Sequence, residues 1–104
     1  MNKQKIIDEI NKTKEYLANL EKMLIRRRLE DIARRLNKGR NIDWNDGNQI
    51  KYCICFNFPL DTISICARLH QKLQGSVYCL SAKFKDVAIQ EIGKERLKEY
   101  LRGE

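Results

Sequence analysis

The chain has 104 residues, of which 21 are Lys or Arg and 14 are Asp or Glu, so its formal net charge is +7. One domain with a modest core is expected at this length. The charge favours an anionic partner such as nucleic acid or a nucleotide, although a basic surface that only aids solubility explains it equally well. No apolar run approaches the ~20 residues of a membrane span. We therefore expect no membrane partner, and a cytoplasmic protein whose four cysteines stay reduced.

Residues 3–38 have the composition of one long helical segment. They contain no Gly or Pro and are rich in Lys, Glu, Leu and Ile, which are compatible with helix. Apolar residues recur in alternating steps of four and three, which is the spacing of a coiled-coil seam. The seam residues are Ile6, Ile10, Thr13, Leu17, Leu20 and Leu24. This pattern predicts that residues 1–39 form an oligomerisation segment and that the protein is a homo-oligomer.

A second apolar stripe follows the seam with a shift of one position. It consists of Ile25, Leu29, Ile32 and Leu36. A shift of one position rotates the apolar face of a helix by about 100°. We expect the seam to pair between chains and the second stripe to pack on the globular part, either as one helix that changes partner or as two helices with a bend. The helix is expected to end at Gly39.

Residues 40–104 are predicted to form a small α+β domain packed on this helix as a single structural unit. A turn-rich connector, residues 40–49, contains Trp44, for which a place at the edge of the core is favoured over a ligand role. Alternating apolar residues predict strands at 50–58, 62–70 and 76–80. By this alternation Tyr52 and Phe58 share the core face of the sheet. Short connections favour an antiparallel meander of the three strands.

A helix or helix pair is expected after the strands. Ser81 is a suitable N-cap, and residues 82–102 return to helical spacing. Gly93 interrupts this run and predicts two short helices. The fold class is therefore α+β, with a long N-terminal helix, a small antiparallel three-stranded sheet and C-terminal helical material.

Catalytic residues are sparse. His70 is the single histidine, no Ser or Cys stands in the context of an activated nucleophile, and there is no glycine-rich phosphate loop. The sequence favours a protein that is not an enzyme and that needs no cofactor and no metal.

The cysteines leave one alternative open. Cys53 and Cys55 point to one face of a strand, and Cys66 and His70 share a face of the next. Three Cys and one His can bind zinc, but structural zinc sites usually come from tight knuckles rather than flat strands. The favoured interpretation is a sheet face covered by another chain or by the first helix.

The run from Arg26 to Arg28 is the most distinctive feature. Position 27 follows Leu24 as the next seam position, and a charge there is costly unless an anion compensates it. Symmetry-related arginines facing one axis would suit phosphates. The alternative is that the seam ends at Leu24 and all three arginines are solvated. The candidate ligand-binding residues are Arg26, Arg27, Arg28, Trp44, Phe58, Arg68, His70 and Phe84.

The second half also resembles small phage-encoded proteins. The residues that carry the resemblance are Trp44, the strand Lys51-Tyr52-Cys53-Ile54, the run Gly75-Ser76-Val77-Tyr78, and the tail from Ala88 to Leu101. Together with the leading helix, they make the chain similar to the first-described Thoeris anti-defence family. That resemblance implies an oligomer that binds cyclic ADP-ribose-type immune signals, with cyclic oligonucleotides as a second ligand class, and does not cleave them. It assigns no binding residue here, and it does not account for the cysteines of the strand.

Two other functions remain open. A phage regulator or anti-CRISPR protein would bind nucleic acid or a nucleoprotein through the basic helix, along Arg34, Arg35, Lys38 and Arg40. The sequence shows no helix-turn-helix signature to support this alternative. A coiled-coil adaptor would need no small ligand.

Overall fold

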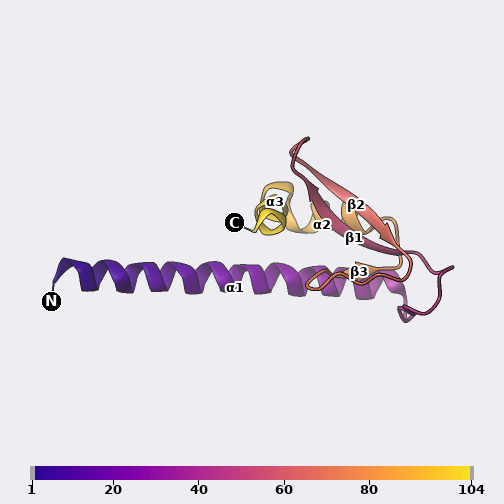
Figure 1. The fold of residues 1–104 in the computed structure, drawn as a ribbon, viewed down its shortest axis with the longest axis horizontal. Helices are drawn as coiled ribbons and strands as arrows, with labels where there is room; N and C mark the ends of the chain where they lie inside the picture. The colour runs from indigo at the N-terminus through magenta and orange to yellow at the C-terminus, as the bar shows by residue number, and fades with distance from the viewer. Residues whose placement is uncertain (1, 104) are drawn as a thin grey trace.

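The structure is a computed structural model that describes residues 2–103 (Figure 1). It has an α+β fold, as predicted. The helix α1 comes first, the three-stranded antiparallel sheet follows, and two short helices complete the chain. The elements are α1 (Lys3–Asn37), β1 (Lys51–Asn57), β2 (Thr62–Arg68), β3 (Tyr78–Cys79), α2 (Phe84–Ile92) and α3 (Lys94–Arg102).

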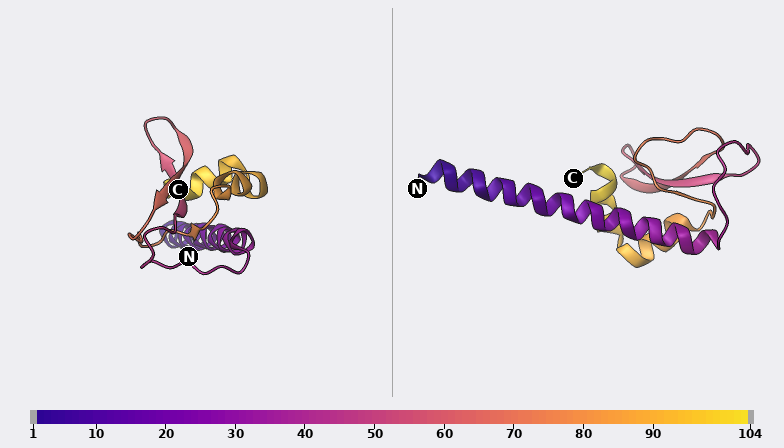
Figure 2. Two further views of the ribbon diagram at one scale, coloured as in Figure 1. Left: turned by 90° about the vertical axis from the view of Figure 1, so that its right-hand side faces the viewer. Right: turned by 90° about the horizontal axis from the view of Figure 1, so that it is seen from below.

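The helix α1 is continuous, so the two apolar stripes belong to one helix. The side chain of Asn2 caps it by accepting a hydrogen bond from the backbone N–H of Lys5 at 2.9 Å. The helix ends at Asn37, because Lys38 takes a left-handed backbone conformation with φ of 53°. The first part of α1 extends well past the rest of the chain (Figures 1 and 2). The radius of gyration is accordingly 17.0 Å, against about 13 Å for a compact domain of this length.

The second stripe of α1 packs into the core, as predicted. Ile25, Leu29 and Ile32 are each 2–3% exposed, and Leu36 packs against the same cluster. The seam residues upstream are on the surface, with Leu17 58% and Leu24 60% exposed. A single helix therefore buries one apolar stripe and leaves the other in solvent. The core is completed by residues of the sheet and the C-terminal helices, among them Ile63, Cys79, Phe84, Ala88 and Leu97.

The strand order is β2-β1-β3, so the predicted meander is wrong. β3 pairs antiparallel with β1, through Tyr52 with Cys79 and Cys53 with Tyr78. Contacts with α1 hold β3 at this edge: the side chain of Asn37 accepts a hydrogen bond from the backbone N–H of Leu80 at 2.8 Å. Chain proximity favoured β2 as the neighbour of β3, but burial of β3 against α1 selects the other edge of β1 (Figure 1).

The C-terminal helices are separated at Gly93, as predicted, where φ is +100°. The prediction that Ser81 caps this region is wrong, because α2 begins at Phe84 and its N-cap is Lys83. Ser81 lies in the preceding turn, where its hydroxyl accepts the N–H of Lys83 at 3.2 Å.

The core face of the sheet is only partly as expected. Ile54 packs against the core, but Phe58 lies after the end of β1 and is 68% exposed, so its predicted core position is wrong. The alternation of β1 stops at Asn57, and Phe58 then packs edge-on against Phe56 with ring centroids 4.9 Å apart. None of the helices described within residues 2–103 is long and apolar enough to span a membrane.

Candidate functional site

Three adjoining hollows run along one side of α1, and Glu30 lines all of them. We call this feature the basic groove and define it by Arg26, Arg27, Glu30, Arg34, Arg40, Trp44 and Lys72. The hollows have volumes of about 500, 190 and 360 Å³, from the seam toward the end of α1. α1 alone lines the hollow of about 500 Å³. In the other two hollows α1 supplies one wall, and the connector and residues up to β3 supply the other.

The groove carries five cationic side chains and one carboxylate. Arg26 is fixed in place: its Nε lies 3.1 Å from Glu30 and its Nη1 donates to the carbonyl oxygen of Gly75. Arg34 pairs with Asp31 at 3.2 Å on the exposed surface, while Arg40 and Lys72 are exposed. Glu30 and Asp31 each pair with one of the five cations, and the other three give the groove a local excess of positive charge.

An aromatic pair lies in the central hollow. The rings of Trp44 and Tyr78 meet edge to face, with centroids 4.7 Å apart. Trp44 is half-buried, and Lys72 lines the same hollow. Trp44 therefore plugs the edge of the core, as the sequence favoured, and also lines the groove. Cations beside an aromatic surface can take phosphate and base together.

The three consecutive arginines have separate environments, so neither sequence interpretation holds for all of them. Arg26 donates a hydrogen bond to the carbonyl oxygen of Gly75 and lines the groove. Arg28 donates to the carbonyl oxygen of Glu91 in α2 at 2.6 Å and supports the fold. Arg27 is exposed beside Leu20 and Leu24, at the next seam position.

Arg35 supports the fold in the same way as Arg28. Its Nη2 lies 2.6 Å from both carboxylate oxygens of Glu91, and this hydrogen bonding raises the pKa of Arg35. The basic stretch of α1 is therefore divided, because Arg28 and Arg35 bind α2 whereas Arg34 lies in the groove.

Phe58 and Phe84 lie together, but away from the groove. Both line an apolar cavity of about 380 Å³, with Leu29, Ile54 and Tyr100 among its other residues. No charged side chain lines this cavity, so it does not suit a nucleotide phosphate. Phe84 is 1% exposed and is a core residue.

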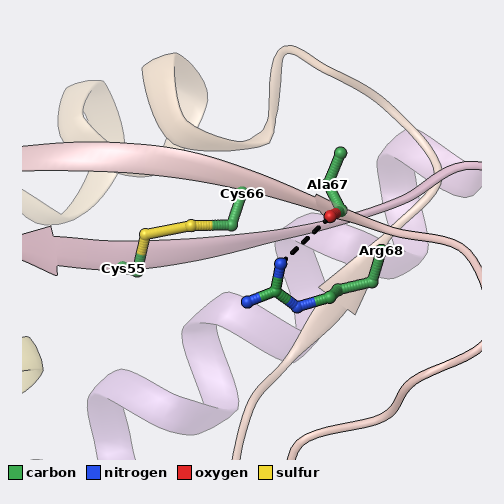
Figure 3. The surroundings of a disulfide bond; sticks show 4 residues. All are labelled: Cys55, Cys66, Ala67 and Arg68. Carbon is green, nitrogen blue, oxygen red and sulfur yellow. Dashed lines mark hydrogen bonds between the residues drawn. A yellow bond between two sulfur atoms is a disulfide. The ribbon is translucent and has the colours of Figure 1, made fainter.

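Arg68 and His70 do not join the groove. Arg68 lies on the outer face of the hairpin, where its Nη1 donates to the carbonyl oxygen of Ala67 at 3.2 Å (Figure 3). Nδ1 of His70 lies 3.2 Å from the carbonyl oxygen of Trp44. Its ring packs against Gly47 so closely that a Cβ there would come within 2.5 Å of Nε2. These contacts indicate that His70 holds the connector.

The predicted reduced state of all four cysteines is wrong, because Cys55 and Cys66 form a disulfide (Figure 3). The register of β1 and β2 brings them diagonally together on one face, with Cα atoms 6.6 Å apart, inside the range a disulfide needs. Cys53 is buried and lies directly opposite Cys66. Burial raises the pKa of the Cys53 thiol, and the nearby charge of Arg68 lowers it by less.

The disulfide also separates the residues of the zinc alternative. With Cys55 and Cys66 bonded to each other and His70 packed on Gly47, the four-residue set is not assembled. Within residues 2–103, no group of three His, Cys, Asp or Glu side chains is placed to hold a metal ion.

Lys51 is a buried residue that the sequence did not single out. It is 0% exposed, and its Nζ donates to the carbonyl oxygens of Asp46 and Leu69 at 2.8 and 2.7 Å. The same ammonium lies 5.4 Å from the ring centroid of Trp44. Lys51 therefore joins the connector to the end of β2 and fixes Trp44. Nothing in the local sequence signals this, since a lysine at a strand end usually faces solvent.

Comparison with known protein families, with curated proteins and with solved structures finds no match to this chain.

Proposed function

We propose that the protein is a self-associating, non-catalytic binding protein that sequesters small anionic nucleotides in the basic groove. The observation that carries the proposal is the groove itself, in which five cations, two of them paired with Glu30 and Asp31, lie along one side of α1 with a Trp–Tyr pair. Phosphates pair well with guanidinium groups, and a base can lie against an exposed part of the Trp44 ring. The central and terminal hollows are together of the order of a small ligand site.

The ligand class proposed is a cyclic nucleotide immune signal of the cyclic ADP-ribose type. It follows from the resemblance to the Thoeris anti-defence family and from the charge of the groove. A phage protein with this function would act in the cytoplasm of the bacterial host. The lining of the groove contains no His or Cys and a single carboxylate, Glu30, which is paired with Arg26. This composition favours retention of an intact ligand over its cleavage.

Native mass spectrometry of the protein with a panel of cyclic ADP-ribose isomers, cyclic dinucleotides and cyclic trinucleotides tests the proposal. We expect whole-number adducts of one ligand class and recovery of that ligand intact after denaturation. Arg40→Glu combined with Lys72→Glu should weaken binding by at least tenfold, because both side chains are exposed in the groove and their loss should spare the fold.

Lys94→Glu combined with Lys83→Glu is the matched control. It makes the same change of net charge at exposed positions outside the groove and should leave binding unchanged. Equal weakening by both pairs would mean that only net charge matters. The absence of any adduct would contradict the proposal. Binding of long DNA or RNA with a steep salt dependence would instead favour the nucleic-acid alternative.

A further inference from the structure

We infer that the seam of α1 joins copies of this chain in a parallel, in-register coiled coil. The Arg27 side chains of the joined copies then form an anion site at the end of this coiled coil, where α1 begins to pack on the globular part of each chain. The anion site rests on the proposed function, since it adds to the groove a cation from each copy. The coiled coil itself follows from α1 alone.

Within the described residues, nothing covers the seam of α1, although Glu21 pairs with Arg96 at 3.6 Å and Lys22 donates to the carbonyl oxygen of Gly103 at 3.2 Å. The seam residues of α1 are exposed, with Ile6 43%, Ile10 48% and Leu20 37% exposed, and the views from the front and from below both show its N-terminal turns extending past the other elements (Figures 1 and 2). Most of the stability of a helix in a protein comes from the packing of its apolar face rather than from intrinsic propensity. Steps of four and three match a partner helix with the same steps, and a second copy of this chain supplies that spacing.

The charges beside the seam select the parallel orientation. With Ile10, Leu17 and Leu24 at position a of the heptad, Glu9 falls at position g and Lys14 at position e. In a parallel coiled coil, position g faces position e of the next heptad on the other chain, so Glu9 meets Lys14 at every interface. In an antiparallel pair that overlaps the whole seam, Lys14 faces Lys14 instead. Both side chains are exposed and available.

Arg27 is the next position d of the same heptad pattern. In the parallel arrangement, the copies of Arg27 meet in one layer directly after the Leu24 layer. Each is exposed and borders the hollow that Leu20, Met23 and Leu24 share with Arg26 and Glu30. Facing cations repel one another at this position, and an anion between them removes the repulsion. The chemistry is that of a phosphate or pyrophosphate group, bound at the seam end of the basic groove.

Sedimentation velocity of the full chain at several concentrations tests the association. We expect a discrete oligomer for the native chain and its loss, by at least tenfold in dissociation constant, in Leu17→Glu. Asn11→Glu adds the same charge at position b of the heptad, outside the seam, where the residue is also exposed, and should leave the oligomer intact. A native chain that is monomeric at micromolar concentration would overturn the inference.

Cross-linking distinguishes the two orientations. In Ile6→Cys, the new thiols lie side by side in a parallel coiled coil and are expected to join the chains under mild oxidation. In the antiparallel pair, position 6 lies opposite position 24, about 27 Å from position 6 of the other chain at 1.5 Å per residue. The native cysteines are paired or buried, so the native chain serves as the control. An oligomer without this cross-link would overturn the parallel orientation.

Thermal unfolding in pyrophosphate tests the Arg27 layer with a variant that should remain folded. Arg27→Leu is expected to tighten the oligomer, since it extends the apolar seam, and to reduce the rise in melting temperature that pyrophosphate gives the native oligomer by at least half. An undiminished rise would overturn the anion site at Arg27. Because Arg40→Glu with Lys72→Glu leaves this layer intact, loss of nucleotide binding in that variant is distinguishable from loss of the Arg27 site.

Discussion

Two apolar stripes with regular helical spacing lie on α1 in opposite environments. The first belongs to residues 3–24 of α1 and is exposed, and the second faces the core of the body, which we define as residues 25–103. Leu24 is 60% exposed, and its neighbour Ile25 is 3% exposed. One position along the chain turns the side chain by about 100°, which is enough to move it from solvent to core. A hydrophobic pattern therefore identifies an apolar face of a helix but does not show whether the rest of the same chain packs against it.

Replacing Leu24 or Ile25 by Ala tests the contrast between the exposed and the buried stripe most directly. Ile25→Ala should lower the free energy of unfolding by about 2–5 kcal/mol, because it opens a cavity in the core. The loss should be the same at every protein concentration. Leu24→Ala should act mainly on association, so its effect on the free energy of unfolding should shrink toward zero as the protein concentration is lowered below the dissociation constant of the native oligomer. Chemical denaturation at several concentrations measures both. A concentration-independent loss of equal size in Leu24→Ala would mean that α1 folds back on its own chain.

Replacing the buried cation Lys51 tests how a cation in the interior differs from one on the surface. Lys51→Met removes two hydrogen bonds and leaves the carbonyl oxygens of Asp46 and Leu69 without their shared donor. The expected loss of unfolding free energy is about 2–3 kcal/mol. Lys83→Met, at an exposed position, should change it by less than about 0.5 kcal/mol. Equal effects would show that the burial of Lys51 does not contribute to stability.

The disulfide offers a test of register within the body. Cys66 lies directly opposite Cys53 and diagonal to Cys55, and residues directly opposite in an antiparallel pair have Cα atoms about 4.5–5.5 Å apart. In Cys55→Ser, we expect oxidation to join Cys53 to Cys66. Peptide mapping under non-reducing conditions would detect the new pair. Recovery of Cys79 joined to Cys66 would contradict the register, since Cys79 faces α1.

The weakest effect is expected at the two free thiols of the body. Burial raises the pKa of both Cys53 and Cys79 above the ordinary thiol value of about 9. The folded state then holds these protons more tightly than the unfolded state, so their contribution to stability is complete below pH 9 and declines as the pH rises above it. Cys79→Ala should flatten the alkaline decline of the unfolding free energy relative to the native chain. An unchanged slope would contradict the shift at Cys79.

Local patterns predicted the elements well. The helix over 3–38, the change of face at Ile25 and the break at Gly93 all follow from residue spacing and backbone preference, which act within a few residues. The meander failed for a different reason. Position along the chain favours β2 as the neighbour of β3, while the burial of Cys79 against α1 is a contact across 42 residues or more and places β3 beside β1.

The candidate site was predicted only in part. Arg26, Arg27 and Trp44 lie in the groove, while Arg28 binds α2, His70 packs on Gly47 and Phe84 is in the core. Lys72 and Arg40 join the groove because the connector and the loop before β3 lie beside α1. Neither residue has a local signal that separates it from an ordinary surface cation.

Residue type and spacing were enough to establish the α+β order of elements, the excess of positive charge and the two stripes of α1, because each of these is a property of neighbouring residues. The strand order, the Cys55–Cys66 pairing and the choice of arginines that line the groove were settled by the folded chain. These depend on contacts between segments far apart in the chain, where packing against α1 outweighs any local preference.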